Sequence, residues 1–173
     1  RLTAGGVESP GQVSIKTNPT SKFEAGGRIV INGVNDVAIN SSIGDKDGLS
    51  LESIEINSLK GDVEIAREAG RIISSGHIQL GARSLGVHGY VEGSGDGASV
   101  DSNFAFISDT PYQREGQAYK RNFDDYHINI GASETVTITG ELKSMGSLLV
   151  AAGGGVAVHD ALLRGGSNIE VLS

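Results

Sequence analysis

Residues 147–166 read SLLVAAGGGVAVHDALLRGG, and this stretch decides the fold class. Two apolar strings, at 148–150 and 156–158, are separated by glycines, and a Gly-Gly pair closes the period at 165–166. Two apolar residues separated by a single residue are typical of a strand with one buried face, because successive side chains point to opposite sides of the backbone. Each string is too short to stand alone, so neighbouring strings must bury it.

Similar strings recur through most of the 173 residues, with Gly or Asn between them. A repeat of about 17–22 residues predicts an all-β solenoid, in which each coil of two or three short strands stacks on the next. We expect a parallel β-helix, a single domain over 1–173 that is interrupted by one long insertion. The strings are VSI 13–15, IVI 29–31, VAI 37–39, LSL 49–51, IEI 54–56, VEI 63–65, IQL 78–80, INI 128–130, VTI 136–138, LLV 148–150, VAV 156–158 and IEV 169–171.

An antiparallel sandwich also uses many short strands, but its hairpins favour Asn-Gly or Asp-Gly loops between strings. Only Asn32-Gly33 fits well, so Gly and Asn corners between parallel strands are the better interpretation. The segments AINS at 38–41 and EINS at 55–58 share one ending, and we expect them to be equivalent positions of the repeat. Asn then either turns corners in the left-handed region and hydrogen-bonds along the stack, or is simply common in turns.

The composition removes several classes of protein. Gly occurs 26 times, and we expect these glycines at turns that need positive φ. The lack of Cys excludes a disulfide scaffold, a thiolate metal site and a cysteine nucleophile. A net charge of −7 without a basic patch predicts no nucleic-acid partner. No apolar run approaches the ~18 residues of a membrane span, and a start at Arg1 with no signal peptide indicates a mature or excised piece.

The C-terminal residues 134–173 resemble the repeats of filamentous haemagglutinin-like exoproteins, which are two-partner-secreted adhesins and contact-dependent inhibition stalks of Gram-negative bacteria. The resemblance rests on the order strand, Gly corner, strand, Asp-Ala-x-Leu and Gly-Gly within 147–166, and it extends more loosely over 27–80. It implies a right-handed parallel β-helix that is exported to the extracellular face of a bacterial cell. Asn18-Pro19-Thr20 matches only a fragment of the Asn-Pro-Asn motifs of the family's secretion domain.

Residues 100–126, VDSNFAFISDTPYQREGQAYKRNFDDY, interrupt the alternation and hold most of the aromatic residues. Insertions in a solenoid form loops on one face, where ligands often bind. We predict a loop that binds a carbohydrate or a cell-surface protein; the alternative is a hydrophobic cluster that only packs the loop itself. The candidate binding residues are Phe104, Phe106, Tyr112, Arg114, Tyr119, Arg121, Phe123 and Tyr126.

Motifs that carry chemistry are weak in this chain. Its four histidines, His77, His88, His127 and His159, lack the spacing of a local zinc site. Asp124 and Asp125 are adjacent, whereas a glycosidase needs two carboxyls about 5–9.5 Å apart, so a solvated loop is the favoured interpretation. The acidic turns at 44–48 and 93–101 lack the ligand pattern of a calcium loop. We therefore expect no metal, no cofactor and no catalytic residue.

Together these features predict a non-enzymatic, extracellular, structural or adhesive β-helix segment that presents the 100–126 loop. Two alternatives stay open. One is a carbohydrate-active β-helix, similar to a polysaccharide lyase, a glycosidase or a phage tailspike, with acids near the insertion. The other is a filament subunit that associates end to end or laterally, because the ends of a rod expose unpaired strand edges.

Overall fold

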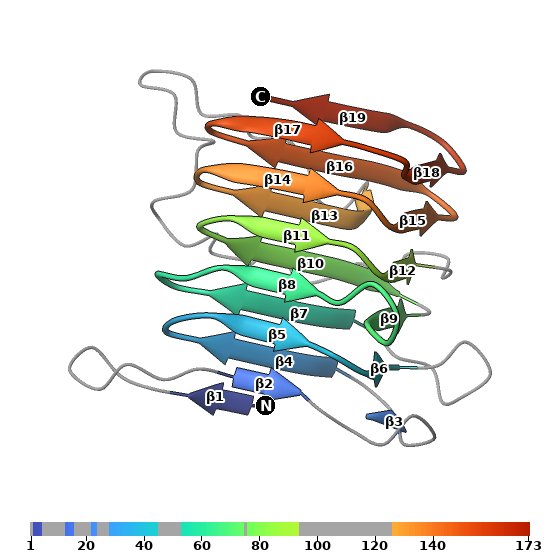
Figure 1. The fold of residues 1–173 in the computed structure, drawn as a ribbon. Coiled ribbons are helices and arrows are strands. Elements are labelled where there is room, and N and C mark those ends of the chain that lie inside the picture. Colours follow the sequence, from blue (N-terminus) through green and yellow to red (C-terminus); the bar gives the residue numbers. More distant parts are fainter. Residues whose placement is uncertain are drawn as a thin grey trace.

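The computed structural model describes residues 2–4, 13–15, 22–23, 28–44, 53–74, 76–93 and 126–173. Over these ranges the chain is built from short β-strands that stack in successive parallel coils (Figure 1). The predicted fold class, an all-β parallel β-helix, is confirmed. Within the described residues, no helix has the length and apolar character needed to cross a membrane.

Three parallel sheets, called A, B and C here, run along the stack. Sheet A has seven strands: β1 (Leu2–Ala4), β4 (Arg28–Gly33), β7 (Ser53–Ser58), β10 (His77–Ala82), β13 (Tyr126–Ala132), β16 (Ser147–Ala152) and β19 (Ile169–Leu172). Sheet B has six: β2 (Val13–Ile15), β5 (Val37–Ile39), β8 (Val63–Ile65), β11 (Leu85–Val87), β14 (Thr135–Ile138) and β17 (Gly155–Val158). Sheet C also has six: β3 (Lys22–Phe23), β6 (Ser42–Ile43), β9 (Arg71–Ser74), β12 (Tyr90–Gly93), β15 (Glu141–Ser144) and β18 (Leu162–Gly165).

The chain visits the sheets in the order A, B, C and then returns to A one layer higher (Figure 1). Each strand therefore pairs with the strand three places later in the chain, so every sheet is parallel. The return from C to A is short in the upper coils, where β15 ends at Ser144 and β16 begins at Ser147. Between β12 and β13 the chain runs from Gly93 to Tyr126, so the insertion lies at this return.

The core consists of apolar columns that the register builds along the stack. Ile54 pairs with Ile78, and Ile78 with Ile128, so that like side chains lie above one another. Such columns form one cluster from Ile29 to Ala152. β-branched side chains suit this packing because they fit against their neighbours on a pleated surface. Each fully buried Ile contributes about 1.5–3 kcal/mol, so stacking supplies the stability that no single coil has.

The repeat length differs between the two halves of the stack. Ile29 pairs with Ile54, an offset of 25 residues, which is also the separation of the hydrogen-bonded pair Asn32 and Asn57. Ile128 pairs with Leu148, an offset of 20 residues. The expected repeat of about 17–22 residues therefore holds for the C-terminal coils and for some earlier pairs, such as Arg71 with Tyr90 at an offset of 19, but not for β4 with β7.

The expected equivalence of 38–41 and 55–58 is wrong. Ala38 pairs with Glu64 in sheet B, whereas Glu55 pairs with Gln79 in sheet A. A short string with one buried face fits either sheet equally well, so the shared Ile-Asn-Ser ending carries no information about register.

The expected roles of Asn and Gly are confirmed only in part. The Asn57 Nδ2 group donates to Asn32 Oδ1 at 3.3 Å, so two Asn side chains do bond along the stack. The expectation that Asn turns the corners in the left-handed region is wrong, because Asp160 is the one non-glycine residue with positive φ among those described. The expectation that the glycines stand at turns with positive φ holds for few of them. Within the described residues, only Gly44 and Gly155 have a positive φ.

Candidate functional site

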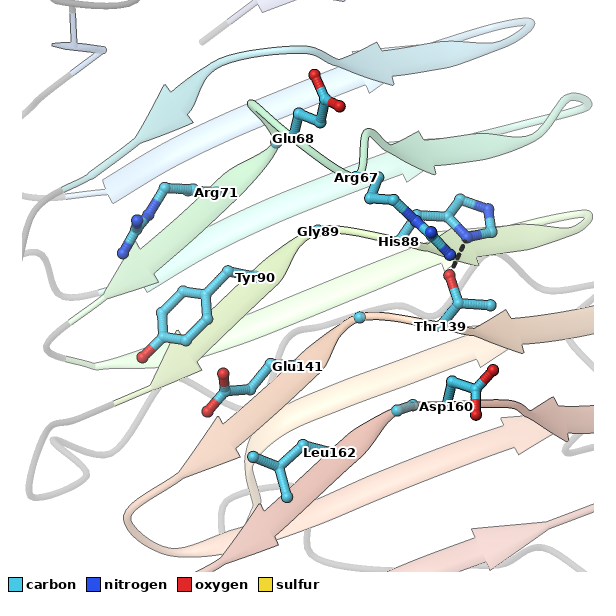
Figure 2. Close-up of a pocket in the computed structure, with 13 residues that line it drawn as sticks. Arg67, Glu68, Arg71, His88, Gly89, Tyr90, Thr139, Glu141, Asp160 and Leu162 are labelled. Atoms are coloured by element: carbon cyan, nitrogen blue, oxygen red, sulfur yellow. Dashed lines mark hydrogen bonds between the residues drawn. The ribbon is translucent and has the colours of Figure 1, made fainter.

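A polar groove of about 480 Å³ lies along the corner where the chain passes from sheet B to sheet C (Figure 2). Its lining comes from equivalent corners of successive coils. The lining residues are Arg67, Glu68, Gly70, Arg71, His88, Gly89, Tyr90, Thr139, Gly140, Glu141, Asp160, Ala161 and Leu162. Because every coil contributes the same corner, the groove runs parallel to the stack axis.

Glycines form the floor of this groove. A Cβ atom on Gly89 would overlap the carbonyl oxygen of Gly70, and one on Gly140 would overlap that of Gly89. The backbone hydrogen bonds account for the close approach: the N–H of Tyr90 donates to Gly70 O at 3.0 Å, and that of Glu141 to Gly89 O at 2.9 Å. The coils are thus too close here for any side chain, and the backbone itself is the floor.

The corner between β17 and β18 is built differently. It contains one residue more than the corner between β14 and β15, and Ala161 stands where the lower coils have glycine. Asp160 adopts a φ of 47°, in the left-handed region that Asp tolerates better than most residues. The extra residue lets the chain turn without a glycine, and it places an exposed carboxylate at the end of the groove.

One wall, the outer row, consists of Arg71, Tyr90, Glu141 and Leu162, the first residues of β9, β12, β15 and β18, which pair in register. The guanidinium carbon of Arg71 lies 4.9 Å from the centroid of the Tyr90 ring, a cation–π distance. The Tyr90 hydroxyl donates to Glu92 Oε2 at 2.5 Å. Burial, together with this bond, raises the pKa of Tyr90 to about 12, so the phenol remains a donor at neutral pH.

The Tyr90 contact belongs to a buried network on sheet C. Glu92 is 7% exposed, and its other carboxylate oxygen accepts a bond from Lys143 Nζ at 2.7 Å. Glu92 and Lys143 are direct register partners in β12 and β15. An ion pair between two adjacent coils, Glu92 with Lys143, therefore stabilises the strands that carry the outer row.

The opposite wall, the inner row, consists of His88, Thr139 and Asp160 at the ends of the sheet B strands. His88 Nε2 lies 2.9 Å from Glu64 Oε1, and His88 Nδ1 lies 2.7 Å from Thr139 Oγ1. Gly86 makes this possible, because a Cβ atom there would overlap the Glu64 carboxylate. Burial raises the pKa of Glu64 above its ordinary value, and the nearby His88 only partly offsets this effect.

Carboxylate, imidazole and hydroxyl in sequence form a relay that can move a proton, and hydrolases activate a nucleophile in this way. Acyl transfer also needs N–H donors directed at the developing oxyanion. The backbone N–H groups of Thr139 and Gly140 instead both donate to Val87 O, at 2.9 and 3.0 Å. The inner row therefore favours a binding and structural role for His88 and Thr139.

Two of the groove's cations have no ion-pair partner among the described residues. Arg67 and Arg71 are both exposed, and the salt bridges of the described chain involve other cations. Glu68, Glu141 and Asp160 supply acids to the same lining. The groove thus offers both positive donors and negative acceptors. Among the described residues, no group of three or more His, Asp or Glu side chains is arranged to hold a metal ion.

The sequence-based candidates lie elsewhere. Phe104, Phe106, Tyr112, Arg114, Tyr119, Arg121 and Phe123 lie outside the described residues, as do Asp124, Asp125 and most of both acidic turns. Tyr126 is the first residue of β13, and only its backbone is described. The binding role of the insertion remains a prediction.

Sequence reasoning missed the groove, although it considered His88 as a metal ligand. A signal exists: Val87-His88-Gly89-Tyr90 and Ile138-Thr139-Gly140-Glu141 place a glycine at the same distance after a sheet B string. The pattern is short and common, and it acquires meaning only once the two corners are known to stack.

No protein-family model matches this chain, and neither the curated proteins nor the solved structures include a match. The three parallel sheets with strands that step by three identify a β-solenoid.

Proposed function

We propose that this chain is a non-enzymatic structural and adhesive segment, a rigid β-solenoid that presents binding surfaces outside a bacterial cell. The observation that carries the proposal is the continuous parallel pairing of the strands along the stack. Sheet A runs from β1 to β19 without a change in direction, and one apolar cluster passes through its coils. A stack of this kind is stiff along its axis, because each coil is held by backbone bonds and side-chain packing to the coils on either side.

The site chemistry supports binding over turnover. The backbone N–H groups of Thr139 and Gly140 both donate to Val87 O within the corner, so they are not directed at an oxyanion beside the Thr139 hydroxyl. The extracellular location rests on the resemblance of 147–166 to exported adhesin repeats. In this proposal the aromatic residues of 100–126 form a second contact surface for a carbohydrate or a cell-surface protein.

A direct test exposes the fluorescently labelled chain to arrays of surface glycans and extracellular proteins, and follows glycan cleavage by reducing-end release. We expect retention on at least one class of ligand with no products over time, and weaker retention when Tyr112 and Tyr119 are changed to Ala. Release of products that stops in Glu64→Gln, or in Asp124→Asn with Asp125→Asn, would instead establish the carbohydrate-active alternative. An absence of binding to any array component would overturn the adhesive proposal.

A second candidate function, a filament subunit, is favoured by the C-terminal end of the stack. Val158, Ile169 and Val171 occupy core columns, yet they are 42%, 46% and 45% exposed. β17, β18 and β19 are also edge strands of their sheets. An apolar end with free backbone groups is suited to pairing with another β-coil.

A further inference from the structure

The arginines of the B–C corner groove differ in their ion pairing from Arg83 at the A–B corner. Arg83, at the A–B corner, binds Asp62 through Nε at 3.1 Å and Nη2 at 3.2 Å. Arg67 and Arg71 line the groove without an ion pair in the described part of the chain. Glu68, Glu141 and Asp160 line the same groove, but no ion pair joins them to either arginine among the described residues, so both guanidinium groups keep donors for an external anion.

The two guanidinium groups stand on different walls. Figure 2 shows Arg67 directed along the inner row toward His88 and Thr139, while Arg71 lies on the outer row beside Tyr90. The Tyr90 ring and its bond to Glu92 hold Arg71 in place. A guanidinium binds a carboxylate through paired N–H donors, and one that is already oriented loses less entropy when it does so.

Acidic residues line the groove as well, and Glu68 stands in the same corner as the arginines. Glu141 and Asp160 follow the arginines toward the C-terminal coils, and Thr139 supplies a hydroxyl between them (Figure 2). Carboxylates accept hydrogen bonds from hydroxyl groups, whereas they repel further anions. The groove therefore suits a ligand that combines negative groups with many hydroxyls.

The groove's shape and polarity favour a sugar chain over a peptide. Ala161 and Leu162 are the apolar side chains of its lining, so it lacks the apolar pockets that anchor peptide side chains. Its floor is bare glycine backbone, over which a ligand can lie flat. Coils repeat at about 4.8 Å, so a linear polymer along the axis would pass Arg71, Tyr90, Glu141 and Leu162 in turn, one at each layer.

We propose that the B–C corner groove binds a linear oligosaccharide that carries carboxylate groups, with Arg67 and Arg71 pairing with the carboxylates and Glu141, Asp160 and Thr139 accepting hydroxyls. This inference deepens the proposed adhesive function and rests on it. The groove is then a glycan-contacting face of the scaffold, separate from the 100–126 insertion.

The test uses the full chain and two matched probes, digalacturonate, which is short enough to place its carboxylates at the arginines alone, and its methyl ester, which has the same sugar backbone without the charge. Calorimetry is expected to detect binding of the acid, weaker binding of the ester, and a loss of affinity as salt is raised. Arg67→Gln and Arg71→Gln should each weaken binding of the acid about tenfold, since a hydrogen bond to a charged group typically has this effect. Arg164→Gln removes the same charge from an exposed position outside the groove and should leave affinity unchanged.

Equal binding of acid and ester, or equal losses in all three arginine variants, would overturn the proposal. Circular dichroism and thermal unfolding of each variant show whether the stack is intact, so a folding defect is distinguishable from a lost contact. If digalacturonate does not bind while other array ligands do, the groove assignment fails and the adhesive function stands. If nothing binds, both fail together.

Discussion

Single glycines set the spacing of the coils at the B–C corner. Gly140 and Gly89 have ordinary φ values, so their necessity comes from space and not from backbone conformation. Gly81 in sheet A is a different case, because a Cβ atom there would meet only the end of the Asn57 side chain, at 2.8 Å. A flexible amide can move aside, whereas a carbonyl in a hydrogen-bonded corner cannot.

These two glycines give a prediction at the residue scale. Gly140→Ala is expected to destabilise the chain by about 1–3 kcal/mol, the usual result of forcing backbone apart in a packed interior. Gly81→Ala is the matched control and should change the free energy of unfolding much less. Urea denaturation followed by circular dichroism measures both, and similar losses in the two variants would contradict the role given to the corner.

Among the elements, the strands of sheet C show the least alternation of buried and exposed apolar residues. Three of them contribute one residue each to the main core cluster: Ile72 in β9, Val91 in β12 and Leu142 in β15. Polar contacts supplement this thin core, and the Glu92–Lys143 pair joins β12 to β15 directly. A buried carboxylate is tolerated only when charge and hydrogen bonds compensate for its lost hydration.

Sheet C therefore offers a prediction at the scale of elements. Lys143→Met should destabilise the chain by about 1–3 kcal/mol, less than the ~3–5 kcal/mol for breaking a fully buried pair, because Lys143 is partly exposed. Adding Glu92→Gln should recover part of the loss, since the uncompensated charge is then removed. Thermal unfolding of the single and double variants measures this coupling; strictly additive losses would contradict it.

At the scale of the stack, the core columns are buried in the middle coils and exposed at the last described coil. Val150 is fully buried, while its register partner Val171 in the next strand of the same column is 45% exposed. Leu59 is just as exposed, at 48%, but it lies on the corner turn between β7 and β8, away from that end. The two kinds of exposure therefore have different consequences for association.

We expect concentration-dependent self-association that Val171→Lys weakens and Leu59→Lys leaves unchanged. A charge at the open end opposes pairing of β-edges, as lysines do on natural edge strands. Sedimentation velocity over a range of concentrations measures the effect. A chain that stays monomeric throughout, or one that both variants affect equally, would remove support for the filament candidate.

The alternation of Val, Ile and Leu by itself determined the parallel class of the fold and most strands of sheets A and B, although β1 and β11 are not among the predicted strings. All the strings within the described residues form strands of these two sheets, and 49–51 lies outside them. Alternation predicts these strands well because it reflects a local property of the chain, namely that successive side chains of a strand point to opposite faces. Sheet C escaped it, since strands such as β15 bury one core residue and leave no period to detect.

Only the tertiary structure decided the register, the reason for the corner glycines and the groove itself. Ala38 and Glu55 look equivalent in sequence, but they lie in different sheets. Register depends on which corners of adjacent coils can approach closely, which is a relation between residues about 20–50 positions apart. The groove follows from the same relation, because Arg71 and Tyr90 become neighbours only when one coil is stacked on the next.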